Sequence, residues 1–337
     1  MEPIAIAVTG LGGYAQVHHR AVLKLEEEGR ARLLCTCDPA PDDFAEFRKE
    51  MRFDARGVQV HTDYAAMLAA HADDLGLVTI PTPVPLHAPM HRAAVERGLP
   101  VYLEKPPTLT HDELEAMIAV EADAAYATNV GFNFIIEHAR RELKGRLLAG
   151  EFGPLKRLSF YAVWPRGLDY YARAGWAGRL RLDGRLVLDS CMGNACSHYL
   201  HNMLFWAGDS ADAWAAADSV EAELYRAHAI ESFDTVFCRA QLDTGVPLAV
   251  GMTHGIIPGP QQPPANWERI ECENATILYK ARACWQVIWR DGRRESGFDI
   301  DASPQLNLGT HLDYLEGKRD RPVTRLVDCR PFVDLYN

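Results

Sequence analysis

The first 130 residues alternate between short apolar runs and longer segments with the apolar spacing of helices. Apolar runs of this length are typical of buried strands, and they lie at residues 4–8, 31–37, 58–61, 75–80, 101–104 and 127–132. Helical segments follow them, at residues 14–28, 41–52, 64–72, 87–97 and 110–126. This alternation predicts an α/β domain with a doubly wound parallel sheet, in which ligands bind at the carboxyl ends of the strands.

After about residue 133 the pattern changes to apolar and polar positions that alternate along longer segments. Strands are expected at residues 155–164, 220–226, 235–242, 248–254, 269–273, 276–281 and 285–289. Helices are expected at residues 137–149, 195–207 and 304–315. Strands joined by tight turns predict a large, open, mostly antiparallel sheet with one face covered. We therefore predict two domains, residues 1–130 and residues 131–337.

A glycine-rich turn joins the first strand to the first helix. Gly10 allows a sharp turn, Gly12 allows the backbone to approach a pyrophosphate, and Ala15 keeps the helix close to the strand. Backbone N–H groups at the start of the helix, around Gly13 and Tyr14, would face the anion. The turn therefore predicts a dinucleotide-binding site.

Asp38 at the tip of the second strand adds to this prediction. Its carboxylate can accept hydrogen bonds from both ribose hydroxyls of an adenosine and would repel a 2′-phosphate. No arginine follows until Arg48, so the sequence favours NAD over NADP as cofactor. The alternative is that Asp38-Pro39 only starts a turn.

Composition narrows the class of protein. The 337 residues carry a net charge of −11, which argues against nucleic acid or an anionic membrane surface as a partner. No apolar run is long enough to span a membrane, and the N-terminus lacks the pattern of a secretory signal. The eight cysteines are scattered, which suits reduced thiols in a cytoplasmic protein better than a disulfide scaffold.

Two segments that follow predicted strands carry candidate chemistry. Glu104-Lys105-Pro106 lies at the carboxyl end of the fifth strand, where a lysine beside a nicotinamide could donate or accept a proton. Pro106 fixes the backbone there and is a candidate for a cis peptide bond. Thr82, between two prolines, and His87 follow the preceding strand. The alternatives are a solvated lysine and a histidine that caps a helix or fills a core.

A third segment runs from Asp189 to Asn202. On a helix, Asn194 and His198 are four residues apart and share one face. A histidine presented beside a lysine and a nicotinamide could take a hydroxyl proton as hydride leaves the carbon. His198 and His201 could also be a metal pair with Cys196. We favour proton transfer and expect no metal.

The candidate segments occur in a fixed order along the whole chain: the glycine turn, Asp38, Pro81-Thr82-Pro83 with His87, Glu104-Lys105-Pro106, Gly131-Phe132-Asn133 and the His198 helix. In this order they resemble the glucose–fructose oxidoreductase, inositol dehydrogenase and rhizopine-catabolism (Gfo/Idh/MocA) family of NAD(P)-dependent oxidoreductases. The resemblance implies an N-terminal Rossmann domain and a C-terminal α/β domain with a large open sheet.

The resemblance also implies roles for single residues. Lys105 corresponds to the catalytic lysine, His198 to a histidine near the substrate, and Asn133 to a contact with nicotinamide or substrate. Thr82, His87 and Glu104 would then line the cofactor site. One face of the open sheet would pair subunits into a dimer or tetramer.

One position departs from the family pattern. The family usually carries Asp four residues before the histidine, where this chain has Asn194. An amide binds a hydroxyl but cannot accept a proton as a carboxylate does. Asp189 could replace the missing carboxylate, or it could be a turn or N-cap residue.

The segment around Trp164 and Arg166 is rich in aromatic and arginine side chains. Such side chains suit the rim of a site for a polyhydroxy substrate, and they are equally enriched at subunit contacts.

We therefore expect an NAD-dependent dehydrogenase that acts on a sugar, cyclitol or related small polyhydroxy substrate. The candidate catalytic residues are Lys105, His198 and Asn194. The alternatives are an NAD-dependent glycosidase that oxidises its substrate transiently, and a regulator that binds the dinucleotide without catalysis.

Overall fold

The protein divides into two compact units, which a computed structural model describes over residues 2–194, 196–256, 266–299 and 303–337. The first unit comprises Met1–Thr108, Asp112–Gly131 and Ser303–Val327. The second comprises Leu109–His111, Phe132–Ala302 and Asp328–Asn337. In the described residues no helix is both long and apolar enough to cross a membrane.

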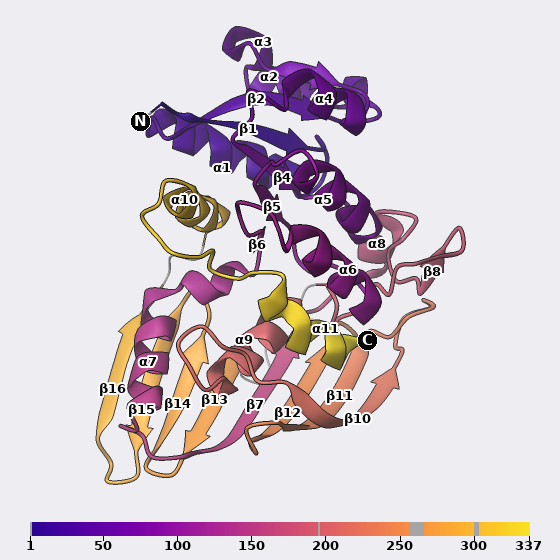
Figure 1. The fold of residues 1–337 in the computed structure, drawn as a ribbon. Coiled ribbons are helices and arrows are strands. Elements are labelled where there is room, and N and C mark those ends of the chain that lie inside the picture. The colour runs from indigo at the N-terminus through magenta and orange to yellow at the C-terminus, as the bar shows by residue number, and fades with distance from the viewer. Residues whose placement is uncertain (1, 195, 257–265, 300–302) are drawn as a thin grey trace. The chain divides into compact units, whose positions relative to one another are not determined.

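The first unit contains a six-stranded sheet in the order β3-β2-β1-β4-β5-β6, with all neighbours parallel (Figure 1). The strands are β1 (Ile4–Thr9), β2 (Ala31–Cys37), β3 (Gln59–His61), β4 (Leu77–Ile80), β5 (Val101–Leu103) and β6 (Asn129–Val130). The helices are α1 (Ala15–Glu27), α2 (Ala45–Glu50), α3 (Phe53–Arg56), α4 (Tyr64–His71), α5 (His87–Val95), α6 (His111–Glu121) and α10 (Pro304–Leu315), with the short turns η1 (Pro41–Phe44) and η2 (Val84–Leu86). The strand order reverses between β1 and β4, which is where doubly wound sheets bind their ligands.

Burial explains why these segments are strands. Ile6, Val8 and Leu77 are completely buried, as expected for the central strands of a parallel sheet that is covered on both faces. The predicted α/β fold of the first unit is confirmed. The region predicted as one helix at 41–52 is instead η1 followed by α2, and Arg52, in a left-handed conformation with φ of 55°, separates α2 from α3.

The first unit also includes α10, which the predicted domain division places in the second domain. Arg30, next to the end of α1, pairs with Asp313 at 2.7 Å and with Glu316 at 3.2 Å. Asn307 donates a hydrogen bond of 2.9 Å to the hydroxyl of Tyr102 on β5. These contacts join segments more than 200 residues apart, which local sequence patterns cannot reveal.

The second unit contains an eight-stranded sheet in the order β10-β11-β12-β7-β13-β14-β15-β16. Its strands are β7 (Leu155–Val163), β10 (Ala217–Tyr225), β11 (Thr235–Leu242), β12 (Pro247–Thr253), β13 (Trp267–Cys272), β14 (Ala275–Lys280), β15 (Cys284–Trp289) and β16 (Arg294–Phe298). The pairs between these neighbours are antiparallel apart from β12 with β7, which is parallel. The predicted open and mostly antiparallel sheet is therefore confirmed.

Helices cover one face of this sheet (Figure 1). They are α7 (His138–Leu148), α9 (Ser197–Ala207) and α11 (Arg330–Tyr336), and the short turn η3 (Asn133–Ile136) precedes α7. The sequence patterns did not predict β16, α11, the short helix α8 (Leu168–Ala172) or the hairpin of β8 (Arg181–Leu182) and β9 (Arg185–Leu186). The predicted start of α9 at position 195 lies outside the described residues.

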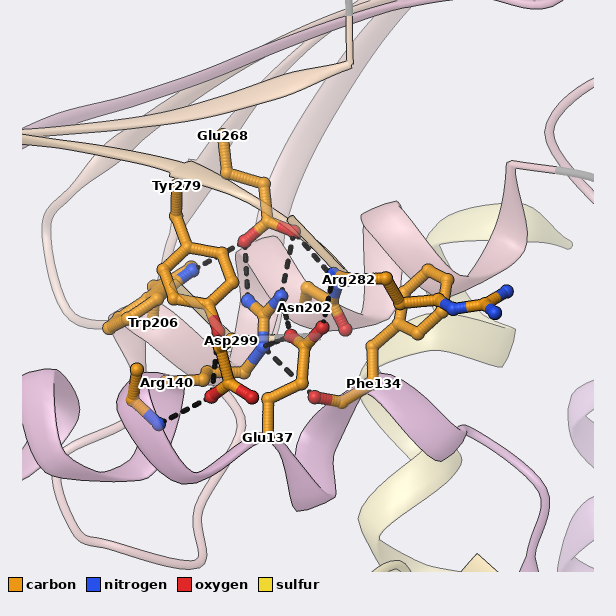
Figure 2. Close-up of polar contacts among 10 residues, drawn as sticks. Phe134, Glu137, Arg140, Asn202, Trp206, Glu268, Tyr279, Arg282 and Asp299 are labelled. Carbon is orange, nitrogen blue, oxygen red and sulfur yellow. Dashed lines mark hydrogen bonds and ion pairs between the residues drawn. The ribbon is translucent and has the colours of Figure 1, made fainter. Parts of the chain in front are cut away.

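A buried ion cluster joins this layer of helices to the sheet (Figure 2). The Arg140 guanidinium on α7 lies between Glu137, at 2.8 Å, and Glu268 on β13, at 2.5 Å, and all three side chains are fully buried. Glu268 also accepts hydrogen bonds from Asn202 at 2.8 Å and from Trp206 at 2.7 Å, both on α9. The cluster therefore fixes α7 and α9 on the sheet.

The same cluster holds the turn η3. Arg140 Nε donates a hydrogen bond of 3.1 Å to the backbone oxygen of Phe134. Burial opposes the charge of Arg140, but the neighbouring carboxylates of Glu268 and Glu137 outweigh it and raise the pKa of the guanidinium. Burial raises the pKa of Glu137, against the effect of Arg140.

Candidate cofactor and active site

The turn between β1 and α1 has the geometry expected of a dinucleotide site. Gly10 has a φ of 94° and Gly13 a φ of 54°, both in the left-handed region that favours glycine. The Gly10 N–H donates a hydrogen bond of 2.7 Å to Cys37 O at the end of β2. Burial lowers the pKa of His19 to about 3, so its ring is neutral and donates from Nε2 to Gly10 O at 3.0 Å.

The turn leaves room for a pyrophosphate. A Cβ added at Gly13 would meet no atom within 4 Å, and the N-cap residue Tyr14 makes no side-chain cap bond to the first turn of α1. A Cβ added at Gly12 would lie 2.8 Å from the Phe44 ring. Gly12 is therefore needed for close packing against η1, a contact that the sequence did not predict. The described residues of the turn fit a dinucleotide.

Asp38 lies beside this turn. Its Oδ2 accepts a hydrogen bond of 2.9 Å from the Leu11 N–H, and its Oδ1 accepts one of 3.0 Å from the Ala40 N–H. The carboxylate thus links the end of β2 to the glycine turn, and its remaining lone pairs can accept ribose hydroxyls.

Replacing Asp38 with alanine is expected to reduce the preference for NADH over NADPH by roughly 10-fold or more, because a charge-assisted hydrogen bond and a repulsive charge are both lost. Fluorescence titration with both nucleotides measures this ratio. Asp38→Asn keeps an acceptor for the Leu11 N–H but loses the charge, and Asp43→Ala alters an exposed neighbour. An unchanged ratio in both Asp38 variants would show that this carboxylate does not select the cofactor.

The segment after β5 is fixed by a buried carboxylate. Glu104 is 6% exposed, and its Oε1 lies 3.0 Å from His18 Nε2 on α1. Its Oε2 accepts a hydrogen bond of 3.2 Å from the backbone N–H of Lys105. The Lys105–Pro106 peptide bond is cis. His18 lies three residues after Ala15, but a lone histidine in a helix gave no signal strong enough to predict this pair.

His87 links the loops that follow β4 and β5. The ring is buried; Nε2 lies 2.8 Å from Thr82 O, and Nδ1 lies 3.1 Å from Pro106 O and 3.2 Å from Pro107 O. These contacts to backbone oxygens position the Thr82 and Lys105 segments. Direct contacts of Thr82 and His87 with a cofactor remain predictions.

In the second unit, His198 lies on α9 against the turn that carries Asn133. The His198 ring is 4.6 Å from the ring of Phe134 and 5.9 Å from that of Phe132, and Asn133 is 6% exposed. His201 stacks on Phe132 at 3.9 Å. Among the described residues no group of three or more His, Cys, Asp and Glu side chains is placed to hold a metal ion.

Asn194 precedes α9 instead of lying on it, so the predicted helical spacing to His198 is wrong. The helix begins at Ser197, whose hydroxyl donates a hydrogen bond of 2.8 Å to Asn194 O. The Asn194 side-chain amide donates to Asp189 Oδ1 at 2.9 Å and to the Tyr170 hydroxyl at 3.4 Å. Asp189 Oδ2 accepts the Gly178 N–H at 2.7 Å. A carboxylate therefore lies next to Asn194, although position 194 itself carries an amide.

Asn194→Asp would place two carboxylates within hydrogen-bond distance, so one of them should have a raised pKa. A carboxyl group with a raised folded-state pKa stabilises the fold below its unfolded pKa and loses that contribution as pH rises through the folded value. We expect the free energy of unfolding to be about 1–3 kcal/mol lower than that of the wild type, with a difference that grows between pH 5 and pH 8. Urea unfolding of both proteins at the two pH values measures it, and a loss independent of pH would contradict this explanation.

The predicted residues thus form two groups, one in each unit. The glycine turn, Asp38, Thr82, His87, Glu104 and Lys105 lie in the first unit, and Asn133, Trp164, Arg166, Asn194 and His198 lie in the second.

Comparison with known proteins identifies the first unit. Residues 4–132 match the family model described as "Oxidoreductase family, NAD-binding Rossmann fold". Over 100 residues the chain is 39% identical to inositol 2-dehydrogenase 4 of Saccharopolyspora erythraea, covering 29% of this chain and 28% of that protein. Over 140 residues it is 39% identical to D-xylose 1-dehydrogenase (NADP(+)) 2 of Haloferax volcanii, covering 41% of this chain and 40% of that protein. The matches therefore span less than half the length of either relative.

The whole fold has known counterparts. The WlbA dehydrogenase from Bordetella pertussis, solved in complex with NADH and UDP-GlcNAcA, superposes with a TM-score of 0.76 over 98% of this chain and 93% of that chain, at 20% identity. Residues 4–132 thus match the NAD-binding Rossmann fold of that oxidoreductase family model.

Proposed function

We propose that the protein is a dehydrogenase that transfers a hydride between NAD and a sugar, a cyclitol or a related polyhydroxy substrate. The observation that carries this proposal is the Glu104–Lys105–Pro106 segment at the carboxyl end of β5. There a buried glutamate, held by His18, binds the backbone of the lysine at 3.2 Å. This support fixes the backbone from which the half-buried Lys105 side chain projects.

In this proposal residues 1–130 bind NAD, which supplies the hydride acceptor when bound. The glycine turn binds the pyrophosphate, and Asp38 binds the adenosine ribose. Residues 131–337 bind the substrate, with Asn133, Trp164, Arg166 and Asn194 contacting its polar groups.

Lys105 and His198 exchange the proton of the reacting hydroxyl. Protonated at Nζ, Lys105 can donate a hydrogen bond to the oxygen, and neutral His198 can accept a proton from it. Asn194 holds a hydroxyl without taking its proton, and Asp189 supplies the nearest carboxylate to that amide.

The decisive experiment is a screen of the purified protein with NAD and a panel of myo-inositol, xylose, sugar acids and sugar phosphates, followed by absorbance of NADH. NADH formation with at least one of these substrates is the expected result. Cleavage of a glycoside without net NADH would instead indicate the glycosidase. NADH binding without any turnover would indicate a regulator.

We also propose that the uncovered face of the eight-stranded sheet joins subunits into a dimer or tetramer. Tyr161 and Phe237 are 53% and 51% exposed, and both rings lie against Gly251 on the strand between them. A hollow of about 320 Å³ continues the apolar surface, lined by Ser159, Tyr161, Trp267, Arg269 and Leu278. Light scattering of the purified protein tests this, and a monomer at micromolar concentration would contradict it.

A further inference from the structure

The parallel pair of β7 and β12 brings two loops together at the carboxyl ends of these central strands. Thr253 at the end of β12 lies opposite Val163 at the end of β7. Beyond these ends the Trp164 N–H donates to Thr253 O at 3.0 Å, and the Arg166 N–H donates to His254 O at 3.2 Å. Arg166 and His254 are therefore neighbours, although 88 residues separate them in the sequence.

The Arg166 guanidinium lies against aromatic rings. Its Cζ is 4.4 Å from the centre of the Tyr170 ring and 5.4 Å from that of Trp164. Arg166 Nε is buried and has no hydrogen-bond partner among the described residues, and no carboxylate in that part of the chain forms an ion pair with Arg166. Arg166 is half-buried as a whole, but a buried N–H without an acceptor is costly, so the position suits an anion that comes from a ligand.

His254, the neighbour of Arg166, has an unused hydrogen-bond acceptor. Its ring is 2% exposed, and Nδ1 lies 2.7 Å from Trp164 O. Because a backbone oxygen can only accept, Nδ1 carries the proton and Nε2 carries a lone pair. Nε2 is buried and has no partner among the described residues. Burial lowers the pKa of His254, so the ring remains neutral and can accept a hydroxyl proton at Nε2.

Arginine predominates among the charged residues of the loop that follows β7. Residues 164–188 contain five arginines and two aspartates in a chain whose net charge is −11. Two acidic groups, Asp189 and Asp234, also act on His254. Their oxygens accept hydrogen bonds, Asp189 from Gly178 and Asn194, and Asp234 from the backbone of Ala227, and Asp234 also contacts the ring of His228. The Arg173 guanidinium packs on Tyr170 as well, at 3.5 Å from the ring centre.

We propose that Arg166 and His254 form a recognition site for an oxyanion and an adjacent hydroxyl, so that the substrate is a sugar derivative carrying a carboxylate or a phosphate group. Arg166 binds the oxyanion, and His254 Nε2 accepts the hydroxyl. The inference rests on the proposed function, because it names the substrate class of that enzyme. Asn194, which binds Tyr170 at 3.4 Å, connects this site to the segment before His198.

Calorimetric titration of the full-length protein with matched ligands tests the proposal. D-Gluconate and D-glucitol differ only in a carboxylate, and D-glucose 6-phosphate and D-glucose only in a phosphate. We expect one charged ligand to bind roughly 10- to 100-fold more tightly than its neutral counterpart, the effect of a charge-assisted bond. If the preference for the charged ligand is larger in the gluconate pair, the substrate is a sugar acid. If it is larger in the glucose 6-phosphate pair, the substrate is a sugar phosphate.

Variants distinguish the contributions of Arg166 and His254 to ligand binding. Arg166→Gln should abolish the preference for the charged ligand, Arg166→Lys should retain part of it, and Arg179→Gln, at an exposed arginine of the same segment, should leave it unchanged. His254→Ala should weaken charged and neutral ligands by similar factors, because the hydroxyl is present in both.

Equal binding of charged and neutral ligands would overturn the inference. So would a preference for the charged ligand that survives in an Arg166→Gln protein with the wild-type melting temperature. Hydride transfer is measured separately by NADH absorbance. Arg166-dependent anion binding without turnover would support the site while rejecting the dehydrogenase. Turnover of neutral polyols that is insensitive to Arg166→Gln would support the dehydrogenase while rejecting the site.

Discussion

Lys105→Ala is expected to lower kcat by about 10²- to 10⁴-fold, the range that a positioned proton-transfer group contributes. NADH affinity should change little, because the glycine turn and Asp38 remain intact. Single-turnover absorbance measurements give the rate, and fluorescence titration gives the affinity. A solvent isotope effect on kcat should also differ from wild type if the lost step is proton transfer.

The control for this variant is Lys156→Ala. Lys156 is half-exposed on β7 and pairs with Glu273 at 3.5 Å, so it tests the loss of a lysine without the proposed chemistry. We expect this control to have wild-type activity. If Lys105→Ala instead loses NADH binding in parallel with activity, Lys105 has only a structural role.

Arg140→Met is expected to lower the free energy of unfolding by about 3–5 kcal/mol, because it leaves two carboxylates buried without their cation. Glu137 and Glu268 would then face each other in the layer between α7, α9 and the sheet (Figure 2). Urea unfolding followed by tryptophan fluorescence measures the loss, with Trp206 inside the cluster as a reporter.

Arg146→Met is the matched control for this prediction. Arg146 lies on the same helix and pairs with Glu151 at 2.7 Å and Glu295 at 2.8 Å, but all three side chains are partly exposed. Exposed pairs of this kind contribute about 0–1 kcal/mol. Similar losses in the two variants would mean that burial of the Arg140 cluster does not determine its contribution.

Local patterns along the chain were sufficient for the architecture. The runs 31–37 and 235–242 have the observed bounds of β2 and β11, and 304–315 has those of α10. Apolar alternation and glycine turns are local signals, and the fold follows from their order. The strand β16 was missed because Arg294, Glu295 and Ser296 make it polar and its place at the sheet edge requires little apolar surface.

Long-range polar contacts could not be predicted in this way. Arg140 and Glu268 are 128 residues apart and His18 and Glu104 are 86 apart, and each side chain alone is typical of a solvated surface. Asp189 was considered as a substitute carboxylate, but only its contact with Asn194 at 2.9 Å places it beside that amide. The pattern predicted candidate segments for chemistry, and the structure shows which residues of each unit contact them.

The parallel pairing of β7 with β12 has a consequence for how the protein can change during evolution. A parallel pair needs a crossover connection, and here the crossover runs from residue 164 to residue 246. It contains Trp164, Arg166, Asp189, Asn194 and His198, while the strands on either side set the register of the central sheet. Substitutions within residues 164–188 can therefore change the candidate substrate-binding segment without changing any residue of the paired strands β7 and β12.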